Sequence, residues 1–302
     1  MDEPDGAVGG ATPAGGATDP LDAAKACLRG LGQIMFQGHA GTGLLFLAGI
    51  AFSSPWMALG AVLGSAIGMA GGRLMGGDRG EIADGIYGFN AALVGIALPA
   101  LCRPDARIWV LALAGTVLAT ALTRLARGWV PFPTYTAPFV LATWAVLALA
   151  HAVGWTDLMA TASPKVADRG LLGSALDGLA EVMLGANPVT GSLFLAGIAL
   201  SNWRHAAIAL LGSLVGTMVG IYHHDPSISA GLVGFNAALA AMAVYLWRPS
   251  LLGPILAAIV SVPLAEFFPK VWGIPALTAP FIVVTWAVLC VGALEDRFVA
   301  KA

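Results

Sequence analysis

The 302-residue chain is 58% hydrophobic and only 11% charged, with 15 basic and 17 acidic residues. A soluble domain carries about 25% charged residues, so this composition suits a surface in contact with lipid rather than water. The balanced charge excludes a polyanion-binding surface, and no nucleic-acid partner is expected. The three cysteines lack metal-binding or disulfide spacing, so neither a metal site nor a disulfide framework is predicted. The composition predicts an all-α integral membrane protein in a lipid bilayer.

The chain begins with a segment poor in bulky apolar residues and continues as a series of apolar runs. Residues 1–24 are predicted to form a flexible tail, because the Gly, Ala, Pro and Asp of this region bury too little surface to offset ordering. The runs that follow are approximately 28–38, 41–53, 56–72, 86–101, 107–123, 136–154, 176–186, 190–202, 206–222, 231–247, 251–268 and 278–294. A helix needs about 20 residues to cross a bilayer, so the shortest runs are predicted to be half-spans buried in protein.

Four motifs occur twice in the same order, which reveals an internal repeat. TGLLFLAGIA at 42–51 recurs as TGSLFLAGIA at 190–199, and GFNAAL at 88–93 recurs at 234–239. TAPF recurs at 136–139 and 278–281, and TWAVL at 143–147 and 285–289. We therefore predict a first repeat over 25–154, a linker over 155–175 and a second repeat with a C-terminal tail over 176–302.

Duplicated halves with short, Gly- and Pro-interrupted apolar segments are typical of transport folds whose site lies between the repeats. An odd number of spans in each copy would insert the second copy upside down. The basic residues are spread too evenly along the chain to fix its orientation from charge. The motifs alone predict a site between the two repeats and leave the inversion of the second repeat open.

The first candidate site pair is Gln33 in the first repeat and Glu181 in the second, at equivalent apolar positions. Polar side chains in such runs are costly in lipid and usually face a cavity or a partner. The alternative interpretation is a pair of helix-end residues near the lipid headgroups. Both interpretations remain open from the sequence.

The second candidate element is Gly-Phe-Asn-Ala-Ala-Leu, which contributes Phe89 and Leu93 in one copy and Phe235 and Leu239 in the other. Residues four apart share one helix face, so each Phe and Leu are neighbours. Asn90 and Asn236 complete the element, and an asparagine there can also satisfy backbone groups freed at a broken helix end. A structural role and a functional role are equally compatible with this pattern.

The third element breaks the helix in each copy. Pro133 and Pro138 flank Thr136, and Pro275 and Pro280 flank Thr278. Paired prolines forbid a regular helix and free backbone carbonyls, which at membrane depth must line a wet path or find protein donors. The threonines add a hydroxyl to that row of oxygens.

With these motifs the chain resembles the bacterial urea transporters. The signature of that family is Leu-Pro-x-x-Thr-x-Pro-Phe once per half, and this sequence has it at 132–139 and 274–281 with Phe132 and Ile274 in place of the leading Leu. The resemblance covers about 28–294. It implies passive, channel-like urea transport through ten spans and two half-span pore helices, with inverted halves and one pore in each protomer of a homotrimer. It also implies a location in the cell (inner) membrane.

The resemblance implies roles for twelve residues. Gln33 and Glu181 match the polar pair at the ends of the pore helices, and Thr136 and Thr278 match the threonines of the narrow middle. One urea slot would consist of Phe36, Phe89, Leu93 and Val182, and the other of Ile34, Leu184, Phe235 and Leu239. Leu184 stands where the family has phenylalanine, so that slot is expected to be looser on one side.

Other functions fit the sequence less well. An aquaporin-like channel is expected to carry Asn-Pro-Ala in both copies, whereas Asn187-Pro188-Val189 occurs once. An ammonium channel calls for paired pore histidines on spans. A membrane enzyme needs clustered ionisable residues at depth, where Glu181 stands nearly alone, so neither enzymatic activity nor a cofactor is expected. A scaffold without a pore leaves the duplicated broken segments unexplained.

Overall fold

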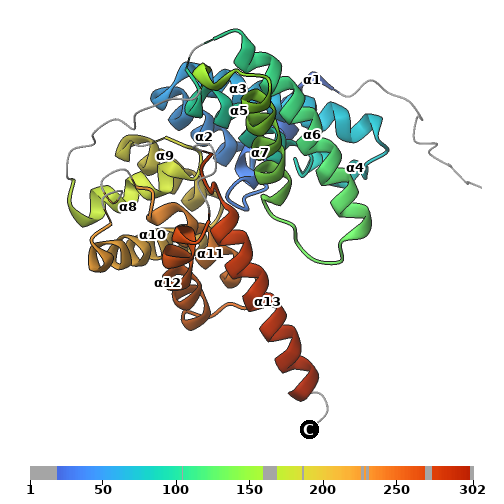
Figure 1. Cartoon of the computed structure of the whole chain (residues 1–302). Helices are drawn as coiled ribbons and strands as arrows, with labels where there is room; N and C mark the ends of the chain where they lie inside the picture. Colours follow the sequence, from blue (N-terminus) through green and yellow to red (C-terminus); the bar gives the residue numbers. More distant parts are fainter. Residues whose placement is uncertain are drawn as a thin grey trace, which may run out of the picture.

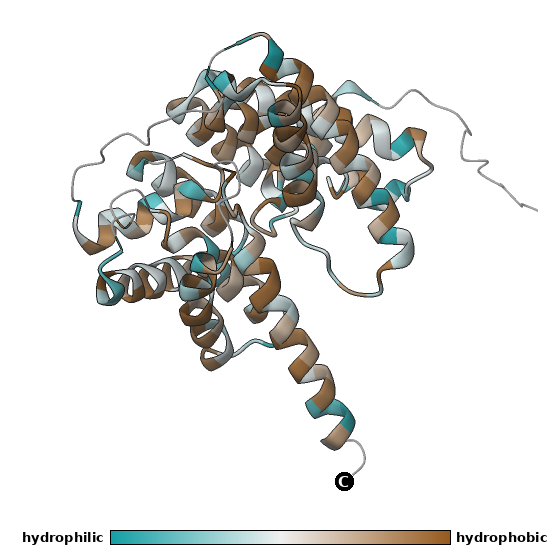
Figure 2. Ribbon diagram, viewed as in Figure 1, coloured by the Kyte–Doolittle hydropathy of each residue, from teal (hydrophilic) through white to brown (hydrophobic). Residues whose placement is uncertain are grey.

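The computed structural model describes residues 19–103, 105–158, 169–185, 187–225, 228, 231–268 and 274–299. Within these ranges the regular elements are thirteen α-helices and one short 3-10 helix, which confirms the all-α prediction. The predicted tail falls mostly outside the described residues, as do residues 159–168 of the predicted linker. Hydrophobic residues cover most of each helix, and hydrophilic ones gather near helix ends and in loops (Figure 2).

The helices form two groups that follow one another along the chain (Figure 1). The first group is α1 (Pro20–Gln33), α2 (Ala40–Ser53), α3 (Pro55–Leu74), α4 (Arg79–Ala83), α5 (Gly88–Leu101), α6 (Arg107–Trp129) and α7 (Ala137–Ala152), followed by η1 (Thr156–Leu158). The second is α8 (Gly170–Glu181), α9 (Pro188–Ser201), α10 (Trp203–His223), α11 (Gly234–Trp247), α12 (Leu252–Glu266) and α13 (Ala279–Val299). The repeated motifs pair α2 with α9, α5 with α11 and α7 with α13.

Four of the described helices are long and apolar enough to cross a membrane: α3, α6, α10 and α13 up to Phe298. Six shorter apolar helices accompany them, namely α2, α5, α7, α9, α11 and α12. A 14-residue helix is only about 21 Å long at 1.5 Å per residue, which is less than the hydrocarbon thickness of a bilayer. The structure is that of a multi-pass membrane protein in which short helices are packed among longer ones.

Two helices begin earlier than the apolar runs indicate. Helix α1 begins at Pro20, where the Asp19 side chain accepts a hydrogen bond from Leu21 N at 2.9 Å. Helix α8 begins at Gly170, inside the predicted linker. Asp22 and Lys25 interrupt the apolar pattern in the first turns of α1, and Gly170 and Gly173 flank the two leucines that open α8, so neither start continues the apolar run that follows it.

Close backbone contact fixes the packing of α3 against α5. A Cβ atom on Gly60 would lie 1.9 Å from Gly95 O, and one on Gly95 would lie 2.0 Å from Gly60 O. Small residues that let backbones approach are typical of helix pairs in membranes, where apolar side chains gain little by leaving lipid. The Gly-Phe-Asn element at the start of α5 is therefore held on a rigid helix pair.

Equivalent helices from the two halves meet in a symmetrical contact between α2 and α9. Thr42 Oγ1 donates to Gly197 O at 2.7 Å, and Thr190 Oγ1 donates to Gly49 O at 2.9 Å. The rings of Phe46 and Phe194 lie between these bonds, with centroids 4.9 Å apart. The start of each helix thus contacts the end of the other, so α2 and α9 run antiparallel.

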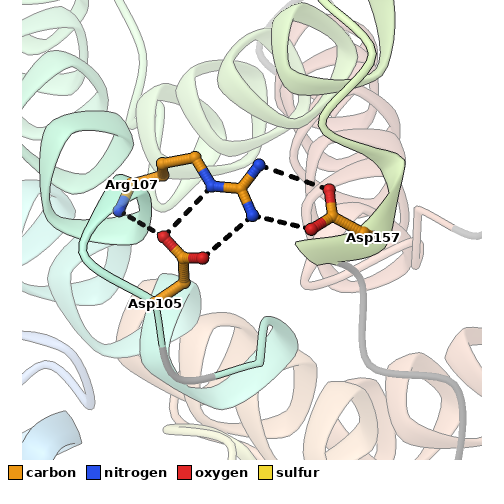
Figure 3. Close-up of polar contacts among 3 residues, drawn as sticks. All are labelled: Asp105, Arg107 and Asp157. Carbon is orange, nitrogen blue, oxygen red and sulfur yellow. Dashed lines mark hydrogen bonds and ion pairs between the residues drawn. The ribbon is translucent and has the colours of Figure 1, made fainter.

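An ion-pair cluster fastens the end of the first half (Figure 3). Arg107 donates to Asp105 from its backbone N (2.8 Å), Nε (3.1 Å) and Nη2 (2.9 Å), and to Asp157 from Nη1 (3.3 Å) and Nη2 (2.6 Å). Its guanidinium also lies 5.5 Å from the centre of the Trp155 ring. The cluster joins the start of α6 to η1. Hydrogen bonds from Arg107 lower the pKa of both carboxyl groups below their usual values.

These lowered pKa values predict a stability contribution that is present at neutral pH and lost in acid. A carboxyl group with a folded-state pKa below its unfolded value stabilises the fold above the unfolded pKa, and the contribution disappears as pH falls through the folded pKa. Arg107→Met is expected to lower the thermal midpoint in detergent at pH 7, and the difference between the two proteins should shrink as the pH falls below the ordinary aspartate pKa. An Arg107→Met effect of equal size at pH 7 and in acid would show that packing, not ion pairing, is responsible.

Candidate functional site

The two Pro-x-x-Thr-x-Pro segments interrupt the helices and place a left-handed residue just before each threonine. Tyr135 has φ 49° and Leu277 has φ 54°, values that residues other than glycine seldom adopt. Thr136 and Thr278 follow at once, and α7 and α13 begin at the next residue. Each break therefore turns the chain sharply and leaves backbone groups that need partners inside the protein.

Asn90 and Asn236 supply those partners in the same way in both halves. Asn90 donates to Tyr135 O at 3.3 Å and accepts from Phe139 N at 3.2 Å. Asn236 donates to Leu277 O at 3.2 Å and accepts from Phe281 N at 3.1 Å. One side-chain amide thus bridges the carbonyl before each threonine and the first turn of the following helix. Of the two sequence interpretations of the asparagines, these bonds favour the structural one.

The halves exchange hydrogen bonds between their broken segments. Trp144 Nε1 on α7 donates to Pro275 O, and Trp286 Nε1 on α13 donates to Pro133 O, both at 3.0 Å. In the same two broken segments, Thr136 Oγ1 and Thr278 Oγ1 lie 2.7 Å apart, and each threonine is only 3% exposed. The sequence assigned both threonines to the same narrow region, and the structure brings them into direct contact.

The polar pair ends the first helix of each half. Gln33 is the last residue of α1 and Glu181 the last residue of α8, and both are partly exposed. Gln33 Nε2 donates to Asp84 O at 3.0 Å, which leaves its carbonyl oxygen available as an acceptor. On α8, Asp177 is fully buried and paired with Arg169 at 2.9 Å. Glu181 therefore lies one turn beyond a neutralised carboxylate.

The turns after α1 and α8 carry the predicted slot residues. Phe36 (φ 62°) and Leu184 (φ 57°) both adopt the left-handed conformation, so the second turn has the same shape with a different side chain. Phe36, Leu184, Phe89 and Phe235 are partly exposed, whereas Ile34, Val182, Leu93 and Leu239 are buried in the core. The partly exposed residues are the ones able to touch a permeating solute.

Two aromatic residues join this region that sequence reasoning did not assign to the site. Phe36 makes edge contacts with Tyr135 at 5.9 Å and with Phe281 at 6.2 Å between ring centroids, and Tyr135 meets Phe281 at 5.3 Å. Tyr135 and Phe281 belong to different halves: Tyr135 directly precedes Thr136, and Phe281 lies three residues after Thr278. Their place inside the repeated motif was the only sequence signal for them.

The asparagine bonds predict that Asn236 is needed for the fold of its half. Asn236→Leu leaves Leu277 O and Phe281 N without their partner in a buried position, where each unsatisfied group costs about 1–3 kcal/mol. We expect a strong loss of thermal stability in detergent. Asn236→Asp keeps the acceptor for Phe281 N, and its carboxyl when protonated can also donate to Leu277 O, so in acid its stability should be closer to wild type than that of Asn236→Leu. Equal stability of Asn236→Leu and wild type would contradict the bridge.

Comparison with known proteins identifies a family and several relatives of the chain. A family model described as urea transporter matches residues 24–248 and 244–301. "Urea transporter 1" of Rattus norvegicus is 30% identical over 244 residues, which cover 72% of this chain and 61% of the rat protein. "Urea transporter 1" of Ovis aries is 28% identical over 294 residues, covering 85% of this chain and 74% of the sheep protein.

Both of these relatives are mammalian, so the particular resemblance to bacterial members stays a prediction. The chain spans about three fifths of the length of the rat relative. The family match covers nearly all of the described helices, including both broken segments and both short helices. The family consists of membrane transporters and not of enzymes. The chain belongs to the urea transporter family.

Proposed function

We propose that this chain conducts urea passively across the cell membrane, through a narrow path between its two halves. The observation that carries the proposal is the contact between the two broken segments, where the hydroxyls of Thr136 and Thr278 meet at 2.7 Å in a buried position. Membership of the urea transporter family supplies the solute. Other features of the path follow from the chemistry of urea.

The proposed architecture is two inverted repeats of five spans each, with α1 and α8 as half-span pore helices. The antiparallel contact of α2 with α9 supports inversion, because equivalent helices in parallel repeats would run in the same direction. The four long and six shorter apolar helices supply ten spans. We propose one pore in each protomer, assembly as a homotrimer, and a location in the cell (inner) membrane.

Urea is planar and uncharged, with one carbonyl acceptor and four N–H donors along its edges. Aromatic rings such as Phe36 on one side and Phe235 on the other would receive its faces, with Phe89 and Leu184 completing the two slots. The buried Ile34, Leu93, Val182 and Leu239 would support these residues from behind. The oxygens of Gln33, Glu181 and the threonines would accept its N–H groups. Ions would be rejected because no counter-charge replaces their hydration.

The threonine pair explains why binding in such a path stays weak. A urea molecule that passes between Thr136 and Thr278 must separate their hydroxyls and take both as partners. One hydrogen bond is thus exchanged for bonds to the solute, which leaves little net gain. Conduction requires sites that are easy to leave. The direct contact fits a channel better than a tight carrier site.

Passive transport predicts that urea flux follows the urea gradient alone. The described part of the chain holds Asp177 as a buried carboxylate of α8, already paired with Arg169, and offers no buried acid–base pair for coupling. Uptake of labelled urea into proteoliposomes should be unchanged by a protonophore or by a sodium gradient. Concentrative uptake driven by either gradient would sink the proposal. Water and methylammonium flux measured in parallel test the aquaporin-like and ammonium-channel alternatives.

The threonines predict a graded loss of flux. Thr136→Val and Thr278→Val keep the side-chain shape and remove one hydroxyl each, at a net value of about 0.5–1.5 kcal/mol per hydrogen bond. Each single variant should conduct urea several-fold more slowly, and the double variant more slowly still. Ser at the same positions keeps the hydroxyl and is the matched control. Wild-type flux through a folded double variant would remove both threonines from the pathway.

A further inference from the structure

A polar cluster joins the two halves at one place that has no counterpart in the repeat. Gln37 follows Phe36 in the turn after α1, and its side chain is buried with 2% exposure. Its amide contacts His205 Nδ1 on α10, with Nε2 at 3.2 Å and Oε1 at 3.4 Å. The offset of 148 residues places Gly185 at the position of Gln37 and Met57 at that of His205. The cluster thus distinguishes the halves.

The N-cap of α10 decides which nitrogen of His205 carries the proton. Asn202 Oδ1 accepts from Arg204 N at 2.9 Å and from His205 N at 3.4 Å, so the amide oxygen is committed to the helix end. Asn202 Nδ2 then faces His205 Nε2 at 3.3 Å as a donor. A neutral imidazole has one donor and one acceptor nitrogen, so Nε2 accepts and Nδ1 bears the hydrogen.

The same logic fixes the Gln37 amide. Because Nδ1 of His205 donates, its partner is Gln37 Oε1, and Gln37 Nε2 is free to donate to Met35 O at 2.9 Å. The hydrogen bonds therefore run in one direction, from Asn202 through His205 and Gln37 to the carbonyl of Met35. With this assignment the 3.4 Å contact of His205 Nδ1 with Gln37 Oε1 is the hydrogen bond, and Gln37 Nε2, which lies 3.2 Å from Nδ1, donates to Met35 O instead.

This series ends on the turn that carries the Phe36 ring. Met35 directly precedes Phe36, whose left-handed backbone (φ 62°) is strained for a residue other than glycine. A bond to the carbonyl before such a residue opposes rotation of the peptide that joins them. The Phe36 ring in turn contacts Tyr135 and Phe281, beside the two threonines.

We propose that His205 is a positioning residue for urea conduction, acting through Gln37 to hold the Phe36 ring at the path. This inference rests on the proposed function for its effect on flux, whereas the direction of the hydrogen bonds stands independently. As a neutral imidazole His205 makes both bonds, whereas a protonated ring still donates from Nδ1 to Gln37 but no longer accepts from Asn202, which fixes its orientation. A proton on Nε2 would face the Asn202 amide donor and force that side chain to give up either His205 or the cap of α10.

Few ionisable groups surround His205, so its own titration can be observed. Its ring contacts Tyr245 of α11 at 6.2 Å between centroids. Along the helices packed against α10, the other ionisable residues are Asp177 and Glu181 on α8 and Glu266 on α12, while α9 has none. On α10 itself Arg204 lies over the Trp203 ring, and His223 and Tyr222 lie at the opposite end. Asp177 is neutralised by Arg169.

The first measurement is the tautomer of His205 in the purified full-length protein. Nitrogen-15 NMR of histidine-labelled protein at pH 8 should show one ring in the Nδ1–H form, and that signal should disappear in His205→Asn. A signal from His205 in the Nε2–H form would overturn the proposed direction of the bonds. This result does not depend on urea being the solute, so it separates failure of the proposal from failure of the proposed function.

The second measurement is urea flux in proteoliposomes from pH 5 to pH 8. His205→Leu removes the donor to Gln37 and should slow flux about fivefold at pH 8, the effect of one lost hydrogen bond. His205→Asn places an amide N–H near the position of Nδ1, so it should restore flux and abolish the fall that we expect in wild type toward pH 5. Met57→Leu, at the equivalent position of the other repeat, is the matched control and should behave as wild type.

A double variant connects the two residues. Gln37→Leu should resemble His205→Leu, and the combined variant should be no slower than either, because both changes break the same series of bonds. Additive losses would show that the two residues act separately and would overturn the proposal. So would normal flux through His205→Leu, or a wild-type pH profile in His205→Asn. Absence of urea flux in wild type would instead contradict the proposed function.

Discussion

The structure depends on satisfying the backbone where two helices are broken inside an apolar protein. In a bilayer an unpaired peptide group has no water to turn to, so a broken helix needs internal partners. Asn90 and Asn236 meet this need with one amide each, spanning from the carbonyl before the threonine to the N–H after the second proline. Because an amide both donates and accepts, it closes the gap while leaving the threonine hydroxyl unused.

Because the threonine hydroxyls are not needed by the backbone, they are available for the contact between the halves. Trp144 and Trp286 donate to prolyl carbonyls of the opposite half, and the threonines meet each other. The exchange is reciprocal, as is the one between α2 and α9, so a single arrangement of the halves satisfies both sets of bonds. The broken segments thereby gain a fixed separation although neither belongs to a regular helix.

The internal repeat made much of this fold predictable from the sequence. The contacts between the two copies could not be predicted in this way. The repeated motifs gave the pairing of helices, and the apolar runs 28–38 and 176–186 marked the helices that end at Gln33 and Glu181. The starts at Pro20 and Gly170 were not predicted, because charged residues in α1 and glycines in α8 separate the first turns from the apolar runs that follow. The bond between Thr136 and Thr278, and the rings of Tyr135 and Phe281 around Phe36, arise from residues 99 or more positions apart. No local pattern encodes such contacts.

The two halves differ at a few residues that depart from the repeat. Phe36 is matched by Leu184 at the same left-handed position, Gln33 by Glu181, and Gln37 by a glycine. The turn after α1 carries the larger side chain, Phe36, and has the additional hydrogen bond from Gln37 to Met35 O. The turn after α8 carries Leu184 and has no equivalent of Gln37. A Cβ at Gly185 would lie 2.8 Å from Ser53 Oγ, so a side chain there would have to displace the Ser53 hydroxyl from its contact with Thr190 Oγ1. The halves therefore share the same backbone arrangement at the broken segments and differ in how the turn after α1 and the turn after α8 are held.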